Sequence, residues 1–159
     1  MGIDDVHNTL KNGKGKSASA TFTPAATSHT GGDCNGAAAE FALVAPAGCQ
    51  FQITDVSLLI AGATVESTVW TLHLYSVTPP SALADDAVWD IPSGDRASYL
   101  GSVSLGTAVD VGASQWVKTS GLTPVFTLTG TSLFGYLVNV TTLTPAAVAH
   151  TVTIKGYPV

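Results

Sequence analysis

Two runs of alternating apolar and polar residues dominate the middle of this 159-residue chain. They occupy residues 51–76, FQITDVSLLIAGATVESTVWTLHLYS, with a glycine-containing link between them. Alternation with a period of two indicates half-buried β-strands, because successive side chains of a strand point to opposite faces. The link offers Gly62 for a turn, so the stretch predicts an antiparallel hairpin at the centre of a β-sheet.

The first of these strands carries apolar side chains on both faces near its middle. One face holds Val56, Leu58 and Ile60, and the other holds Ile53, Asp55, Ser57 and Leu59. A strand that faces water on one side alternates more cleanly between apolar and polar residues. We therefore expect this strand to be packed both above and below.

Further short strands with turn residues between them are predicted on both sides of this centre, and no amphipathic helix is found. The predicted strands are residues 17–23, 39–45, 97–106, 124–129, 132–141 and 147–157, with a second hairpin at 108–119. Eight or nine short strands indicate an all-β, two-sheet antiparallel sandwich. The Trp and Cys positions do not follow the Cys…Trp…Cys pattern of immunoglobulin domains. A jelly-roll-like sandwich is therefore favoured, with an immunoglobulin-like one as the alternative.

The chain is poor in charge: 45% of its residues are hydrophobic and only 11% are charged, against roughly 25% in an average soluble domain. This composition suits a protein that is packed against others, and it equally suits a Thr- and Ala-rich sandwich on its own. The net charge of −5 argues against nucleic acid as a partner, since no basic patch is present to neutralise phosphates.

Residues 1–16 differ from the rest of the chain, so we expect a flexible N-terminal arm followed by one domain at 17–159. The arm carries three lysines and two aspartates, for a net +1, which leaves −6 on the remainder. Such an arm has its own partner or is a disordered terminus. No segment has the 18 or more apolar residues that indicate a membrane span, and the start has no apolar core typical of a secretory signal. Cys34 and Cys49 are expected to be free thiols in a reducing compartment.

No catalytic or cofactor motif is present, and the four histidines are scattered singly, so we expect no enzyme activity, no cofactor and no metal site. His150 lies on an apolar strand face, which is typical of a hydrogen-bonded core residue. The long loop at 77–96 contains Asp85, Asp86, Asp90 and Asp95. Paired carboxylates can serve as general acid and base or bind Ca²⁺, but turn formation is favoured because Asp side chains bond to nearby backbone groups.

Trp89 is the most conspicuous residue of that loop. It is interpreted as a plug that folds the loop onto the core, as an anchor for a partner protein, or as an aromatic platform for a sugar. Tryptophan is enriched at the centres of protein interfaces, and loops of this length in compact domains are often functional.

Two segments resemble known proteins: PPSALADDAVWDIPSGDRASYLGSVSLG at 79–106 and TSLFGYLVNVTTLTPAA at 131–147. They are similar to small head decoration, or cement, proteins of tailed bacteriophages. The resemblance implies a β-sandwich, assembly often as a homotrimer, and attachment to the major capsid protein through arms and loops. It also implies a location on the outer surface of the capsid, after synthesis in the host cytoplasm.

The sequence therefore predicts a non-enzymatic virion structural protein that stabilises a capsid by bridging major capsid protein subunits. The alternative is a carbohydrate-binding module, for example on a phage fibre, and an enzyme is the third possibility. The expected partner-binding residues are Asp5, Val6, His7, Leu10, Lys11, Lys14, Lys16, Asp85, Asp86 and Trp89.

Overall fold

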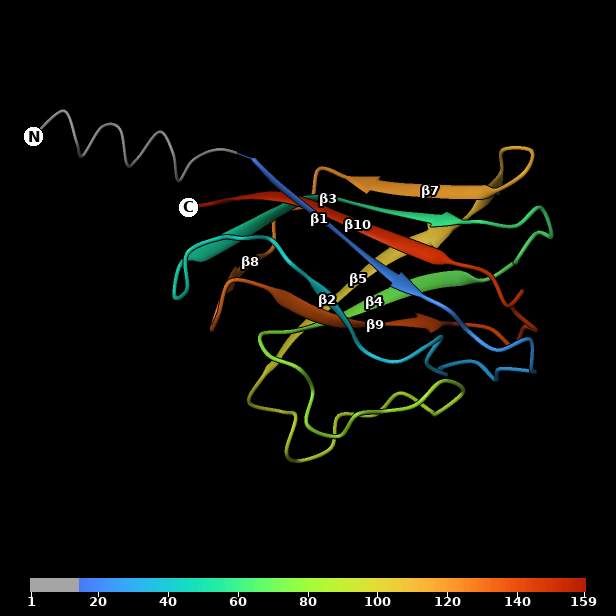
Figure 1. Ribbon diagram of the computed structural model, residues 1–159, viewed down its shortest axis with the longest axis horizontal. Helices are drawn as coiled ribbons and strands as arrows, with labels where there is room; N and C mark the ends of the chain where they lie inside the picture. Colours follow the sequence, from blue (N-terminus) through green and yellow to red (C-terminus); the bar gives the residue numbers. More distant parts are fainter. Residues whose placement is uncertain (1–14) are drawn as a thin grey trace, which may run out of the picture.

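The computed structural model describes residues 15–159, which form ten β-strands (Figure 1). The strands are β1 (Lys16–Phe22), β2 (Ala39–Phe41), β3 (Gln50–Ile60), β4 (Val69–Tyr75), β5 (Tyr99–Thr107), β6 (Val109–Asp110), β7 (Gln115–Ser120), β8 (Val125–Thr127), β9 (Leu133–Asn139) and β10 (His150–Pro158). Each predicted strand is present with shifted ends, and β6 pairs with β7 as the predicted second hairpin. Most of the predicted arm, residues 1–14, lies outside the described residues.

The strands form two antiparallel sheets that pack face to face as a sandwich. The six-stranded sheet has the order β1-β10-β3-β7-β6, with β8 also paired to β3, and the four-stranded sheet has the order β2-β9-β4-β5. Within these sheets, β1 pairs with β10, β2 with β9, β3 with β7, and β4 with β5. This nesting of first with last strand is the double Greek key of a jelly roll. The jelly roll is thereby confirmed over the immunoglobulin-like alternative.

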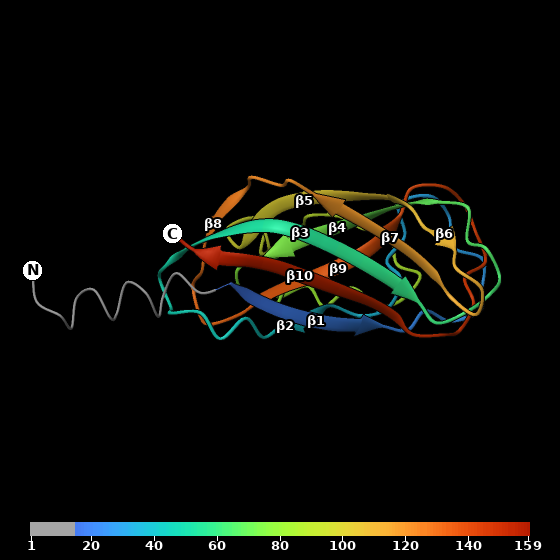
Figure 2. The ribbon, with the colours of Figure 1, turned by 90° about the horizontal axis from the view of Figure 1, so that it is seen from above.

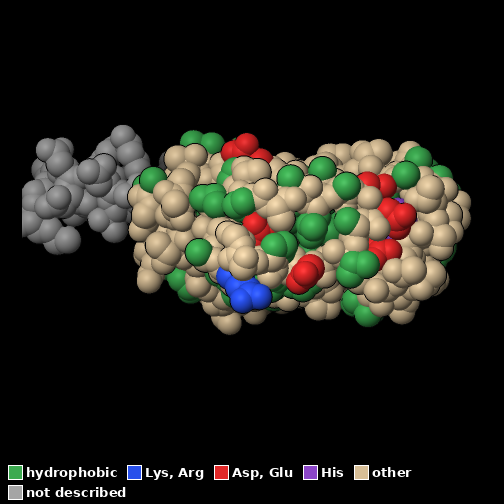
Figure 3. Space-filling view, turned by 90° about the horizontal axis from the view of Figure 1, so that it is seen from below, with side chains coloured by type: hydrophobic (Ala, Val, Ile, Leu, Met, Phe, Trp, Pro, Cys, Tyr) green, Lys and Arg blue, Asp and Glu red, His purple; other side chains and the backbone are tan. Residues whose placement is uncertain are grey.

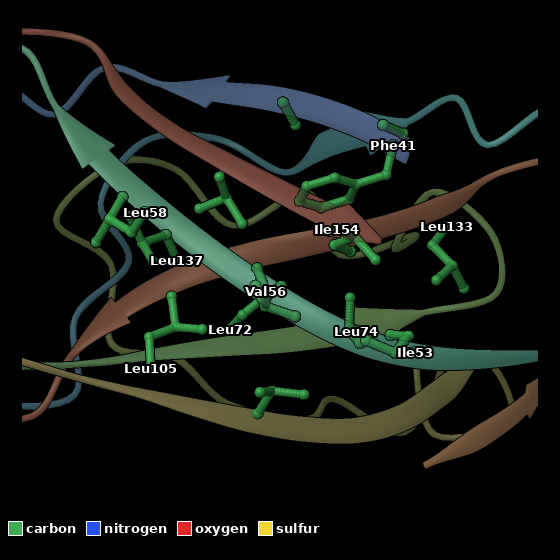
Figure 4. Packing of buried hydrophobic residues seen from close by; sticks show 14 of the residues in the cluster. Phe41, Ile53, Val56, Leu58, Leu72, Leu74, Leu105, Leu133, Leu137 and Ile154 are labelled. Atoms are coloured by element: carbon green, nitrogen blue, oxygen red, sulfur yellow. The ribbon is translucent and has the colours of Figure 1, made fainter. Parts of the chain in front are cut away.

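The core lies between the two sheets (Figure 4). Val56 and Leu58 of β3 and Ile154 of β10 face Leu72 of β4 and Leu137 of β9, and all five are fully buried. The inward positions repeat every second residue, as the alternation of the sequence predicts. His150 lies in this layer as predicted, where its Nε2 is 2.8 Å from Glu66 Oε2 and its Nδ1 is 3.0 Å from the Val148 carbonyl oxygen.

The predicted central hairpin is wrong, because β3 and β4 belong to different sheets. The link at 61–68 crosses from one sheet to the other around the buried Glu66. Glu66 accepts a hydrogen bond from the Ala146 N–H at 2.9 Å and donates its own N–H to Gln115 Oε1 at 2.8 Å. The alternating pattern specifies two strands, but it does not say whether they pair with each other.

The prediction that β3 is packed on both sides is also wrong. Leu59 is 44% exposed, whereas its neighbours Leu58 and Ile60 are fully buried. Ile53 faces the core rather than sharing the outward face of Leu59, because a β-bulge opposite Lys155 and Gly156 resets the alternation. A side chain at Gly156 would overlap the Gln52 carbonyl oxygen and the Phe51 ring, so this bulge requires glycine.

The two cysteines are free thiols, as predicted. Burial raises the pKa of the Cys34 thiol to about 12, and the nearby Asp33 and Asp85 add to the effect. Cys34 therefore stays protonated and unreactive at neutral pH. In the part of the chain that the structure describes, no helix is long and apolar enough to cross a membrane.

Candidate functional site

The long loop between β4 and β5, residues 76–98, crosses the outer face of the four-stranded sheet (Figure 1). Its far end reaches the opposite edge, where the Cys34 N–H donates to the Ala87 carbonyl at 2.8 Å and the Trp89 N–H donates to the Gly32 carbonyl at 2.8 Å. The loop is thus joined by an isolated antiparallel bridge, Asp33 with Val88, to the segment that bridges to β9 through Cys34 and Val138. We call the surface beneath and around this loop the covered face.

An aromatic cluster holds the loop on the sheet. The Trp89 indole stacks on the His73 ring, with ring centroids 3.5 Å apart, and its Nε1–H donates to Tyr75 Oη at 3.2 Å. Tyr136 packs edge-on against Tyr75 and accepts a hydrogen bond from the Leu83 N–H at 2.9 Å. Of the three interpretations of Trp89, the geometry fits the one in which its side chain folds the loop onto the body of the protein. His73 packs under the loop on the outer face rather than between the sheets.

Desolvation by the loop changes the acid–base properties of this cluster. Burial lowers the pKa of His73 to about 4, so the imidazole is neutral at pH 7 and stacks without a charge to desolvate. Burial likewise raises the pKa of Tyr75 to about 12. Neither group is ionised near neutral pH, so the cluster acts by packing and hydrogen bonding.

Several carboxylates of the loop accept hydrogen bonds from backbone N–H groups. Asp85 accepts hydrogen bonds from Ala25 N–H at 2.8 Å and Gly36 N–H at 2.6 Å. Asp95 accepts from the backbone and the hydroxyl of Ser81, and Asp90 accepts from Ile91 N–H at 2.6 Å. Only the Asp90 contact is local, as the turn-forming role favoured from the sequence requires. Asp85 and Asp95 instead connect segments that are distant in the chain. Within residues 15–159, no three His, Cys, Asp or Glu side chains are arranged to hold a metal ion.

His29 is the least satisfied polar side chain near the loop. Its ring is fully buried and neither nitrogen has a hydrogen-bond partner in the described chain. The nearest carboxylates are those of Asp85, 3.8 Å from Nε2, and Asp86, 3.9 Å from Nδ1. The two contacts are on opposite sides of the ring, so they do not converge on one ligand position.

Acidic side chains collect on the covered face (Figure 3). Residues 77–98 contain four aspartates and one arginine, for a net charge of −3. Asp86 remains accessible, with 45% of its side chain exposed, and Val88 is 66% exposed. The outward surface of the loop is therefore acidic with an apolar tip.

No loop of residues 15–159 covers the outer face of the six-stranded sheet (Figure 2). Its outward side chains, which define the uncovered face, are Ser17, Ser19, Thr21, Thr151, Thr153, Lys155, Ser57, Leu59, Trp116, Lys118 and Val109. Leu59 lies opposite Trp116, which lies opposite Val109, and these three are between 42% and 59% exposed. We call them the apolar row.

Charges on the uncovered face are few and mostly neutralised. Lys118 Nζ is 2.8 Å from Asp55 Oδ1, and hydrogen bonds from Lys118, Ser120 and Thr54 lower the pKa of Asp55 to about 2. Ser19 and Thr153 hydroxyls bond to each other at 2.8 Å. The uncovered face combines paired hydroxyls with the apolar row. Burying it against a partner would therefore remove few unpaired charges from water, and burial of such charges is the costly part of desolvation.

A depression of about 330 Å³ opens at the end of the covered face that the loop leaves free. Glu40 of β2 and Phe134 of β9, which are opposite each other in register, lie side by side in its lining. Its other lining residues are Ser76, Val77, Thr78, Thr129, Gly130, Thr131 and Ser132. We call this the Glu40 depression.

The predicted partner-binding residues fall into separate places. Asp85, Asp86 and Trp89 are together in the loop, while Lys16 begins β1 in the other sheet. Asp5, Val6, His7, Leu10, Lys11 and Lys14 lie outside the described residues. Sequence reasoning missed the apolar row and the Glu40 depression. The exposed Leu59 and Trp116 could have been found only from the true partner strands of β3.

No protein-family model matches the chain, and no curated protein matches it. Among solved structures, a chain of the cyanophage Pam1 capsid asymmetric unit is 16% identical, with 92% of this chain and 86% of that chain covered and a TM-score of 0.36. A chain of the Israel acute paralysis virus pentamer is 10% identical, with 98% and 93% covered and a TM-score of 0.33. The CBM22-1 and GH10 modules of Clostridium thermocellum xylanase 10B, complexed with xylohexaose, give 6% identity, 89% and 26% coverage and a TM-score of 0.34. Likenesses this weak assign neither a family nor a function.

Proposed function

We propose that this protein is a non-enzymatic capsid decoration protein of a tailed bacteriophage, which binds the outside of the shell and bridges major capsid protein subunits. The observation that carries the proposal is the contrast between its outer faces: one is covered by the protein's own loop, while the other exposes the apolar row on a flat, charge-poor sheet. We take these three side chains as the centre of the docking surface because they are adjacent across three neighbouring strands. The resemblance of residues 79–106 and 131–147 to decoration proteins supplies the kind of partner.

The uncovered face alone makes a small interface. Five strands spaced about 4.8 Å apart and about seven residues long give a footprint of about 500 Å². A typical stable interface buries about 800 Å² on each partner, so a second contact is needed. The arm, with Asp5, Val6, His7, Leu10, Lys11, Lys14 and Lys16, is proposed to supply it from the end of β1.

The 77–96 loop is proposed as a lateral contact to a neighbouring subunit. The Asp85 carboxylate and the Trp89 indole are already engaged within the molecule, so Asp86 and the exposed Val88 would form the contacting surface, with Asp85 and Trp89 holding it in place. A homotrimer on the outer surface of the capsid, assembled after synthesis in the host cytoplasm, fits this arrangement of one docking face and one lateral loop.

The proposed mechanism is mass action. A protein that binds only the assembled shell stabilises that shell by the free energy of binding. Several linked contacts from one trimer multiply a modest single affinity. Internal pressure must then break the decoration contacts as well as those between capsid subunits.

The test is co-sedimentation of the protein with expanded heads that lack it. Three proteins are compared: the full chain, a variant lacking residues 1–14, which leaves β1 intact, and the full chain with Trp116→Ser. We expect saturable binding by the full chain and at least tenfold weaker binding by each variant, about 1.4 kcal/mol per tenfold. Failure of the full chain to bind would contradict the proposed function.

The carbohydrate-binding module remains the second candidate. The observation that favours it is the Glu40 depression, which combines an aromatic ring, a carboxylate and hydroxyl groups. A fibre module would bind glycans and show no affinity for heads, so the same co-sedimentation experiment separates the two candidates.

A further inference from the structure

We propose that the Glu40 depression binds a neutral saccharide. The proposal concerns a site separate from the uncovered face, since Glu40 and Phe134 project from the outer side of the four-stranded sheet. A protein docked on a capsid by its uncovered face would hold the depression open to the outside. That orientation depends on the proposed function, whereas the binding itself does not.

The polar groups of the depression are largely unoccupied within the molecule. One Glu40 oxygen accepts the Ser132 hydroxyl at 2.6 Å, and the other oxygen has no partner among the described residues. Ser76 is only 8% exposed and lines the depression, yet its hydroxyl bonds to no other described side chain or backbone group. Both oxygens are therefore available to form hydrogen bonds with a molecule bound in the depression.

The apolar part of the depression fits the carbon face of a sugar ring. Phe134 packs against the tyrosine cluster under the loop and also lines the depression together with Val77. An aromatic ring offers a flat apolar surface. Thr78, Thr129 and Thr131 also line the depression. A lining that combines an apolar wall with polar residues is typical of small-ligand sites.

The charges of the lining select against other ligands. No Lys, Arg or His lines the depression, and Glu40 supplies a negative charge, so phosphates and carboxylates are disfavoured by repulsion and by the lack of a cation. A cationic side chain would pair with Glu40 but would make no use of the serine and threonine residues of the lining. Carboxylates accept hydrogen bonds strongly from neutral hydroxyl donors, which a sugar supplies in adjacent pairs.

The size of the depression limits the ligand. Its volume of about 330 Å³ lies at the lower end of the range of small-molecule pockets, about 300–1,000 Å³. It therefore suits one or two sugar residues. Because the depression is open to solvent, the bound unit can be the end of a longer glycan.

The test is saturation-transfer NMR and titration of the full-length protein with glucose, galactose, mannose, N-acetylglucosamine and rhamnose, their common disaccharides, and sialic acid. We expect saturable binding of at least one neutral sugar and none of sialic acid. Glu40→Gln should weaken that binding about tenfold or more, since a hydrogen bond to a charged group is lost. Phe134→Leu, which keeps an apolar side chain in the cluster, should weaken it by about fivefold.

Two matched variants serve as controls. Asp90→Asn neutralises another exposed acid of the covered face, and Tyr157→Leu removes an exposed aromatic ring from the opposite sheet. Both should bind the sugar as the parent protein does. Absence of binding by every neutral sugar, equal loss in the controls, or preferential binding of a Lys-containing peptide of residues 5–16 would overturn the proposal. Binding to heads is unaffected by these outcomes, so failure here is distinguishable from failure of the proposed function.

Discussion

The two outer faces of this sandwich are built from similar strands, but a loop of the chain covers only one of them in the described structure. On the covered face, Trp89 stacks on His73 and donates to Tyr75, and a loop of the same chain closes over them. On the uncovered face, Trp116 stands 42% exposed beside Leu59. The Trp89 ring thus packs within the molecule, whereas the Trp116 ring remains partly exposed in the described structure.

This difference shows how loop length decides the role of a sheet face. A connection of over twenty residues between adjacent strands is far longer than a hairpin needs, so it has chain enough to cross the sheet and bury its aromatic side chains. The six-stranded sheet receives no such connection. Among the described residues, no connection covers its apolar row.

The largest expected effect comes from removing the plug of the covered face. Trp89→Ala deletes the stack on His73 and the hydrogen bond to Tyr75, and we expect a loss of about 3 kcal/mol in the free energy of unfolding, at the low end for a large-to-small aromatic change because the ring is half-buried. Urea denaturation checks this value. A loss below about 1 kcal/mol would mean that the loop is not fastened by Trp89.

The next effect is a pH dependence that comes from His73 of the covered face. The folded-state pKa of His73 is lowered to about 4, so the unfolded chain binds more protons between pH 4 and about 6.5, and stability falls as pH drops through that window. We expect the free energy of unfolding to fall by about 2 kcal/mol across this window. This is less than the pKa shift alone would give, because solvent screens the charge. His73→Phe keeps the stack and cannot titrate, so its stability curve should be flatter than that of the parent protein between pH 6.5 and 4. Parallel curves would contradict the lowered pKa.

A smaller effect is expected from the carboxylates of the loop. Asp85→Asn weakens two charge-assisted hydrogen bonds, to Ala25 and Gly36, and should cost about 1–2 kcal/mol. Asp90→Asn, which changes an exposed aspartate whose bond is to its own neighbour, should cost less than about 0.5 kcal/mol. Equal thermal shifts for the two variants would show that Asp85 does not tie the loops together.

The smallest effect on stability is expected on the uncovered face. Trp116→Ser should change the free energy of unfolding by less than about 1 kcal/mol, because the side chain is exposed. The same substitution should weaken binding to heads at least tenfold, as loss of an interface anchor does. A large loss of stability with unchanged binding would reverse the assignment of the two faces.

The sequence predicted the fold well because period-two alternation is a local property of each strand. Residues 51–60 and 69–75 were recognisable as strands on that basis, and the inward positions of Val152 and Ile154 followed from the same rule. Pairing partners are not local. The separation of β3 from β4 depends on Glu66, Gln115 and His150, which are far apart in the chain and meet only when the sandwich is formed.

The candidate site was predictable only in part, for the same reason. The loop at 77–96 stood out by its length and its aspartates. Residue chemistry predicted local turn contacts, as Asp90 makes, but not the long-range bonds of Asp85 to Ala25 and Gly36. The apolar row did not stand out, because Leu59 appeared to be buried on a two-sided strand. Its exposure follows from the topology, which places β3 next to β7 and leaves their shared outer side without a covering loop.

The most direct test is a cryo-electron microscopy reconstruction of heads decorated with the full-length protein. The sheet of β10, β3 and β7 should lie against the shell, with Leu59 and Trp116 in the contact and the Glu40 depression facing outward. A reconstruction in which the uncovered face points to solvent at occupied sites would contradict the assignment of that face as the docking surface.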